Sequence, residues 1–245
     1  MNFNSSRLLL LRFLLLSLLF LMSCSDDEPI IIPEIDTTEL TDFQIETIDY
    51  FINVALGFEF GGASMITRKW NEDIRISVTG DMPDYLLEEL DEIISELNDL
   101  MTDGVSISLA EANEPSNFLI FSGSGAAYAA INPGASTFVR NNSGLFFVNW
   151  DAQQNLISAD MYVDTRQVEE VFQMHLLREE LTQSLGLARD RIEYPESIFQ
   201  ASWTATTEYA DIDKELIRLL YHPDVTSGLN EDQVRQVLVE ILSNE

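Results

Sequence analysis

Hydrophobic and polar residues follow two different periods along the chain, and these predict helices near both ends and strands in the middle. Apolar residues recur at helical spacing at residues 43–56 and 85–101, and residues 167–186, 211–221 and 231–242 are expected to form three further helices, with breakers between the last two. Alternating or short apolar runs predict strands at residues 74–78, 105–109, 118–121, 145–148 and 156–163, with Phe138 as a further strand candidate. Residues 123–134 are small, glycine-containing and uncharged, so we expect a loop there.

The order of these elements predicts the fold class. A helix, a strand, a second helix, several strands and then helices indicate an α+β domain, with a twisted mixed sheet backed by helices. Residues 41–245 contain no repeat and no linker rich in glycine, serine or proline. This length suffices for one core, so we expect a single folded domain over residues 41–245.

The N-terminus predicts export and a lipid anchor. Arg7 and Arg12 precede an apolar run over residues 13–22, which is too short to span a bilayer and is typical of a secretory signal peptide over residues 1–23. Leu21-Met22-Ser23-Cys24 resembles the lipobox of bacterial lipoproteins, and Cys24 is the sole cysteine. The resemblance implies a membrane partner through lipid on Cys24, followed by an acidic flexible tether over residues 24–40.

The first residues of the tether bear on localisation. Ser25-Asp26-Asp27-Glu28 resembles the export signal that sends lipoproteins of the Bacteroidetes to the outer face of the outer membrane. The resemblance implies an outer membrane lipoprotein of the cell envelope that is exposed on the surface. The alternative is a solvated acidic spacer, in which case the leaflet stays open.

The charge balance restricts the partners. The full chain has a formal net charge of −29, and removal of the two arginines in residues 1–23 makes it −31. Such a field repels nucleic acid and disfavours close contact with anionic lipid headgroups. We therefore expect no nucleic-acid partner, and membrane affinity that comes from the lipid. A single cysteine also excludes an intramolecular disulfide.

The segment from His175 to Asp190 carries the candidate chemistry. Against the metzincin pattern H-E-x-x-H-x-x-G-x-x-H it matches at Glu180 and Gly186, but Glu179 and Gln183 replace two zinc histidines. Arg189 stands at the third ligand position, beside Asp190. A catalytic zinc needs about three protein ligands, and arginine cannot be one. The sequence therefore predicts no zinc site of the ordinary kind and no cofactor.

Several motifs together resemble a known family. The segment above, with residues 70–76, 194–199 and 219–223, is similar to the bacterial domain of unknown function 2927, over most of residues 43–242. That family resembles metzincins in fold and carries an E-E-x-x-Q-x-x-G helix in place of the histidine version. The resemblance implies a zincin-like fold without an established activity. Leu229 departs from the family, which usually has methionine there.

The degenerate site allows two interpretations. Steps of four residues place His175, Glu179 and Gln183 on one stripe of a helix, where Glu179 and Gln183 can form a buried polar pair that fixes the helix. Such a carboxylate needs hydrogen-bond donors. Alternatively His175, Glu179 and Asp190 bind a metal, and Glu180 is the catalytic general base. We favour the structural interpretation, because a lone histidine and carboxylates on a helix are usually packing residues.

Three hypotheses for function follow. The first is a non-catalytic, protease-like domain that binds a protein, peptide or glycan in the former active-site cleft. The second is a hydrolase or peptidase with an atypical metal site on the Glu179-Glu180 helix. The third is an architectural lipoprotein of the envelope. The aromatic residues near the front and at Trp203 and Tyr209 are expected in the core or at the rim of a cleft. The sequence indicates no oligomeric state.

Overall fold

The computed structural model describes residues 37–111 and 113–245. The expected signal peptide over residues 1–23, the lipid anchor Cys24 and most of the tether over residues 24–40 lie outside the described residues. Within the described ranges, none of the helices combines the length and apolar character that a bilayer span needs.

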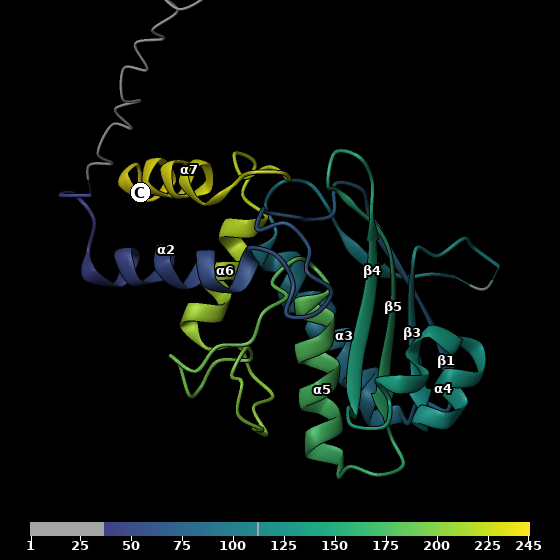
Figure 1. The fold of residues 1–245 in the computed structure, drawn as a ribbon. Coiled ribbons are helices and arrows are strands. Elements are labelled where there is room, and N and C mark those ends of the chain that lie inside the picture. The colour runs from purple at the N-terminus through teal and green to yellow at the C-terminus, as the bar shows by residue number, and fades with distance from the viewer. Residues whose placement is uncertain (1–36, 112) are drawn as a thin grey trace, which may run out of the picture. The chain divides into compact units, whose positions relative to one another are not determined.

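The described chain is a mixed α/β structure, which confirms the α+β class (Figure 1). The helices are α2 (Asp42–Ala55), α3 (Asp84–Leu100), α4 (Gly125–Ile131), the 3-10 helix η1 (Pro133–Thr137), α5 (Glu170–Gln183), α6 (Asp211–Leu220) and α7 (Glu231–Ser243). The strands are β1 (Ile74–Gly80), β2 (Ile107–Leu109), β3 (Phe118–Gly123), β4 (Gly144–Trp150) and β5 (Leu156–Asp164).

The strands form one five-stranded sheet in the order β2-β1-β3-β5-β4. The pairs β1–β2, β1–β3 and β3–β5 are parallel, whereas β4 runs antiparallel to β5. The strand β3 lies between two parallel neighbours and is buried along nearly its whole length, and its sequence accordingly begins with an apolar run. The antiparallel strand β4 closes one side of the sheet and leaves its outer edge without a strand partner among the described residues.

The two faces of the sheet are covered by different helices (Figure 1). On one face, α4 and η1 bury an aromatic cluster, with Leu145 and Phe147 of β4 packed against it. On the other face, α5 packs on β4 and β5, and it also contacts α3. Side chains alternate between the faces of a strand, so Gly144, Phe146 and Val148 lie on the α5 face. The aromatic residues of this cluster are Phe121, Tyr128 and Tyr162, and Ala135 packs with them.

Helices α2, α6 and α7 pack together beyond α3 and α5 (Figure 1). Thr41 caps the start of α2, because its hydroxyl accepts a hydrogen bond from the Gln44 backbone N–H and the Gln44 side chain accepts one from the Thr41 N–H. Asn230 and Gln233 make the same reciprocal bonds at the start of α7. These caps satisfy backbone donors that the first helical turn leaves free.

The loop predicted at residues 123–134 is wrong, because α4 and η1 occupy it. The hydroxyl of Ser124 caps α4, and the helix contains four alanines, which favour helical structure. Gly125 does not signal a loop here, since a Cβ on it would lie 2.9 Å from the Cβ of Val139. It is a close-packing position.

Two further expectations fail in detail. Phe138 is not in a strand, because it ends η1 with helical backbone angles. The long helix starts at Glu170 instead of residue 167, because the backbone N–H groups of Arg166 and Gln167 donate to the Asp164 carboxylate and hold that segment in a turn. The other predicted strands and helices are confirmed to within a few residues.

Candidate functional site

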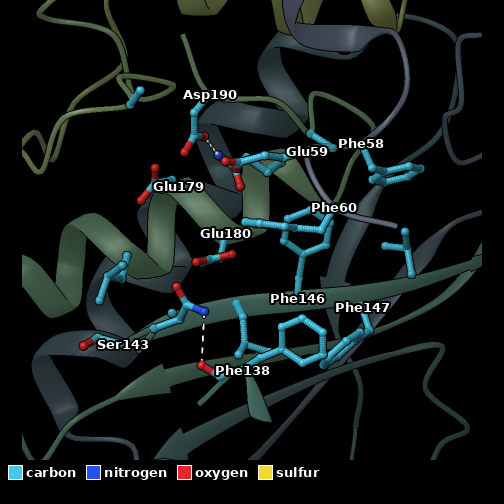
Figure 2. A pocket seen from close by; sticks show the side chains of 18 of the residues that line it. Phe58, Glu59, Phe60, Phe138, Ser143, Phe146, Phe147, Glu179, Glu180 and Asp190 are labelled. Carbon is cyan, nitrogen blue, oxygen red and sulfur yellow. Dashed lines mark hydrogen bonds between the residues drawn. The ribbon is translucent and has the colours of Figure 1, made fainter. Parts of the chain in front are cut away.

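A cleft of about 570 Å³ lies between the edge strand β4 and the helix α5 (Figure 2). Residues 143–148 and Trp150 form one wall, and α5 contributes the opposite wall from His175 to Gln183. Residues 58–61 with Ala63, and residues 200–203, complete the rim. The structure thus brings most of the candidate residues from the sequence, His175, Glu179, Glu180, Gln183 and Asp190, to one cleft.

The register of β4 shows which backbone groups face the cleft edge. The backbone N–H of Asp164 donates to the carbonyl oxygen of Ser143 at 2.7 Å, so these two residues form a hydrogen-bonded pair. Hydrogen-bonded pairs alternate with non-hydrogen-bonded pairs in an antiparallel ladder, and the register continues unshifted to residue 149. Gly144, Phe146 and Val148 therefore direct their N–H and C=O groups away from β5, toward the outer edge of the sheet.

His175 and Glu179 form a pair on the α5 wall. The Nδ1 of His175 lies 2.7 Å from the carbonyl oxygen of Thr206, so Nδ1 carries a proton and donates it. The Nε2 lies 3.3 Å from Glu179 Oε2. Burial lowers the pKa of His175, but the hydrogen bond and charge of Glu179 outweigh burial and leave the pKa raised. The partner of Glu179 is thus His175 and not Gln183, and Nε2 donates to Glu179 when His175 carries its second proton.

Glu180 is the most enclosed carboxylate in the cleft. Its residue is 8% exposed, and its side chain makes no hydrogen bond to any residue in the described part of the chain. A Cβ on Gly144 would lie 2.6 Å from Glu180 Oε1, so the glycine in β4 provides the space for this carboxylate. Burial raises the pKa of Glu180 well above its usual range, and the charges of Glu179, Asp190 and Glu59 raise it further.

Gln183 and Asp190 form the other pair of the motif. The Gln183 side-chain amide donates to Asp190 Oδ1 at 2.6 Å (Figure 2). Burial, followed by the charges of Glu179 and Glu59, raises the pKa of Asp190 to about 7, even though Gln183 and Arg191 act in the opposite direction. Glu179 and Gln183 do not bond to each other, because each has a partner of its own, and the Gln183–Asp190 hydrogen bond ties α5 to the segment that follows it.

Gly186 and Arg189 have structural roles. Gly186 has a φ of +119°, and a Cβ on it would overlap the backbone carbonyl oxygen of Arg68. The guanidinium of Arg189 donates from Nη1 to the Leu56 carbonyl oxygen at 3.3 Å. The third ligand position of the metzincin pattern is thus filled by a side chain that ties the segment after α5 to the end of α2.

Aromatic side chains surround the opening of the cleft, and Phe60 and Trp203 are exposed there. Phe58 stacks on Trp150 with 5.5 Å between ring centroids, and the Arg68 guanidinium lies 4.5 Å from the Trp150 ring. The sequence left the aromatics at residues 58, 60 and 203 open between the core and the rim, and it did not single out Trp150 or Phe146. Phe146 belongs to a predicted apolar strand, and that pattern does not show which side of the strand faces a cleft.

The ligand set does not suit a zinc ion. Among residues 37–111 and 113–245, no three His, Cys, Asp or Glu side chains converge closely enough to hold a metal. The amide nitrogen of Gln183 faces Asp190, and the Arg189 guanidinium is a cation bound to a carbonyl. At two of the three positions that hold zinc in the metzincin pattern, the group is therefore unsuitable: Arg189 is a cation that repels the ion, and the Gln183 amide is bonded to Asp190.

The fold and cleft define a mixed α/β domain in which an acidic helix faces the open edge of a sheet. The family model described as Protein of unknown function (DUF2927) matches residues 44–240, and the chain therefore belongs to this family. The family resemblance of the sequence motifs is thereby confirmed. No curated protein matches the chain.

Proposed function

We propose that this protein is a membrane-anchored lipoprotein whose domain binds an extended peptide segment in the cleft, along β4, without cleaving it. The observation that carries the proposal is the open outer edge of β4, which lines the cleft. An extended peptide can add to such an edge as a further strand, with main-chain hydrogen bonds for affinity and pockets for alternate side chains.

The composition of the cleft supports a peptide over a glycan. The N–H and C=O groups of Gly144, Phe146 and Val148 repeat at the spacing of a strand, which matches a polypeptide backbone and no regular feature of a sugar chain. Phe146 lies on the α5 face of β4 and lines the cleft, where its ring can pack against an apolar side chain. The cleft volume of about 570 Å³ falls within the usual range for ligand sites.

We infer further that the domain is zincin-like and lacks the zinc chemistry of that class. The support is the position of the E-E-x-x-Q-x-x-G helix, which forms a wall of the cleft, and the unsuitable groups at Gln183 and Arg189. The lipid anchor on Cys24 and the outer membrane location rest on the sequence motifs alone. Lipid on Cys24 would hold the cleft near a membrane surface.

The test is peptide retention on the immobilised full-length protein in detergent, with random nonapeptides that have blocked ends and mass spectrometry as the readout. Val148→Pro removes an outward N–H of β4 without removing a β4–β5 hydrogen bond. We expect its affinity for retained peptides to fall about threefold to tenfold, the value of about one hydrogen bond. Val148→Ala is the matched control for the lost side chain. Retention of no peptide, or equal affinity for the two variants, would contradict binding along β4.

A second candidate is a hydrolase in which Glu180 acts as a general acid or base. The observation in its favour is the raised pKa of Glu180 and of Asp190, since an acid that keeps its proton near neutral pH can donate it. The test is cleavage of the same peptides, together with metal analysis of the purified protein. Turnover that is lost in Glu180→Gln would establish the enzyme, and a stoichiometric metal that is lost in Glu179→Ala would favour it.

A further inference from the structure

The cleft contains an acidic region in which carboxylates outnumber basic side chains. Glu59, Glu179, Glu180 and Asp190 all line it, and His175, which lies beside Glu179, is the one basic residue among the lining residues (Figure 2). Two arginines close to Asp190 in sequence bind backbone carbonyls, with Arg191 on Asn53 and Arg189 on Leu56. Glu180 and Asp190 therefore have no lysine or arginine side chain bound to them within the described residues.

Glu180 gives this region a polar group that needs a partner. The residue is more than nine-tenths buried, its carboxylate faces β4 across the cleft, and no described residue donates a hydrogen bond to it. Its oxygens are not among the fully buried atoms without a partner, so a donor that enters the cleft can reach them. A hydrogen bond from a positively charged donor to a carboxylate is stronger than one between neutral groups.

The other carboxylates that line the cleft with Glu180 differ in their hydrogen-bond partners. Gln183 uses its amide N–H on Asp190 Oδ1, which fixes that carboxylate and leaves its other oxygen free of hydrogen bonds to described residues. The Glu179 carboxylate lies 3.3 Å from His175 Nε2. The exposed Glu59 stands at the entrance. A cation that enters past Glu59 would meet carboxylates from two segments of the chain.

We propose that the acidic region, defined as Glu59, Glu179, Glu180 and Asp190, binds the ammonium or guanidinium group of a lysine or arginine side chain of the bound peptide. This inference rests on the proposed peptide binding along β4. The side chain of a peptide residue paired with β4 would point from the strand edge toward α5, where Glu180 lies beside Gly144. The aromatic rings of Phe60 and Phe146 can cover its aliphatic part.

The alternatives for the occupant are weaker on geometry. A divalent metal would need several ligands at short distance, and no three such side chains converge in the described part of the chain. A lysine or arginine needs only hydrogen bonds, which tolerate longer distances and a wider arrangement of acceptors. The pKa values of Glu180 and Asp190 are raised by burial and by the neighbouring carboxylate charges, and a bound cation would offset both effects.

The test uses two pools of blocked random nonapeptides that contain no other charged residue. The pools differ only at the central position, which is lysine in one and Nε-acetyl-lysine in the other. We expect the full-length protein in detergent to retain the lysine pool at least tenfold more strongly at physiological salt. Glu180→Gln should reduce this ratio at least fivefold while the acetyl-lysine pool binds as before. Asp190→Asn should reduce the ratio in the same direction.

Glu240→Gln is the matched control, because it removes one negative charge from an exposed position of α7. It should leave the ratio unchanged, which separates local recognition from attraction to the overall negative charge. Equal retention of both pools by the wild type would overturn the cation inference and leave peptide binding intact. Retention of neither pool would overturn both. A lysine preference that Glu180→Gln leaves unchanged would also overturn the inference.

Discussion

The acidic residues of the cleft differ in their surroundings, and these differences decide their chemistry. Glu180 is enclosed between α5 and Gly144 with no hydrogen-bond donor among the described residues, whereas Glu179 lies beside His175 Nε2. Asp190 has one donor, the Gln183 amide. Burial, with no donor to offset it, raises the pKa of Glu180, and burial raises the pKa of Asp190 in spite of its one donor.

Asp190 should make the stability of the domain depend on pH. Its pKa is about 7 in the folded chain and about 3.8 in an ordinary environment, so the folded state binds more protons between these values. Its contribution to stability is complete below about pH 4 and is lost as the pH rises through 7. Asp190→Asn should therefore exceed the wild type by roughly 2 to 4 kcal/mol at pH 8 and match it near pH 4.

Urea unfolding of the full-length protein at a series of pH values measures this difference. The groups that interact with Asp190 are His175, Glu59, Glu179, Glu180, Gln183 and Arg191, and all are unchanged in the variant. Glu240→Gln is the control at an exposed position. A gap between Asp190→Asn and the wild type that is constant over pH 4 to 8 would show that Asp190 does not keep its proton.

Gly186 should be intolerant of any side chain. Its φ of +119° is unfavourable for other residues, and a Cβ would overlap the Arg68 carbonyl oxygen. We expect Gly186→Ala to lower the free energy of unfolding by at least about 2 kcal/mol, because strain and the clash add. The control is Gly228→Ala, where φ is +90° but no atom lies near the added Cβ. Thermal unfolding measures the loss of stability in both variants. A similar loss in Gly186→Ala and Gly228→Ala would show that the close approach to Arg68 is unimportant.

At the scale of elements, α5 is buried on several sides and uses polar side chains to contact each neighbour. Gln173 accepts from the Tyr85 hydroxyl on α3, and His175 donates to the Thr206 carbonyl oxygen in the segment before α6. Arg178 Nη2 lies 2.8 Å from Glu89 Oε1 on α3. This explains why α5 lacks an amphipathic pattern, since no face of it is simply a solvent face.

The Arg178–Glu89 ion pair should be important for stability. Both residues are buried, and Arg178 also lies 4.6 Å from the Tyr209 ring centroid. Arg178→Ala leaves the Glu89 carboxylate buried without its cation, so we expect a loss of about 3 to 5 kcal/mol in urea unfolding. The double variant Arg178→Leu with Glu89→Leu should recover most of that loss. A single variant as stable as the wild type would contradict this role.

The second partner of Arg178 provides a control. Glu96 lies 2.6 Å from Arg178 Nη1, but its side chain is 44% exposed. Glu96→Gln should therefore change stability by less than about 1 kcal/mol, as is usual for a pair that water reaches.

The sequence predicted most elements but missed those that depend on tertiary contacts. Alternation and helical spacing located the strands and the long helices, because those patterns reflect one buried face. Helix α4 was missed because Gly125 signals a loop in isolation, and its close packing against Val139 is visible only in the fold. The start of α5 was misplaced because the turn before it depends on the Asp164 carboxylate of β5.

The candidate site was predicted in its residues but not in its pairings. The spacing of the motif brought His175, Glu179 and Gln183 to one stripe of a helix, as the structure shows. It could not show that Glu180 on the next stripe would be the more buried carboxylate, because α5 has neighbours on several sides. The row of outward backbone groups on β4 depends on pairing with β5, which no local pattern of the sequence encodes.

At the scale of the whole molecule, we expect the lipid on Cys24 to provide the attachment to the membrane. Cys24→Ala should move the protein from the membrane fraction to the soluble fraction of cells, because the acyl chains supply the affinity and the acidic domain is repelled by anionic headgroups. Ser25→Ala is the control, since it leaves the cysteine in place. Cell fractionation with detection of the protein measures the change. Persistent membrane attachment of Cys24→Ala would contradict the anchor.

Binding along β4 is tested most directly by residue-resolved amide hydrogen exchange of the full-length protein in detergent, with and without a saturating peptide from the retained pool. We predict slower exchange at the outward N–H groups of Phe146 and Val148 when peptide is bound. The N–H groups of Leu145 and Phe147, which already pair with β5, should change much less. Protection that is absent from β4, or confined to a surface away from the cleft, would contradict the proposed function.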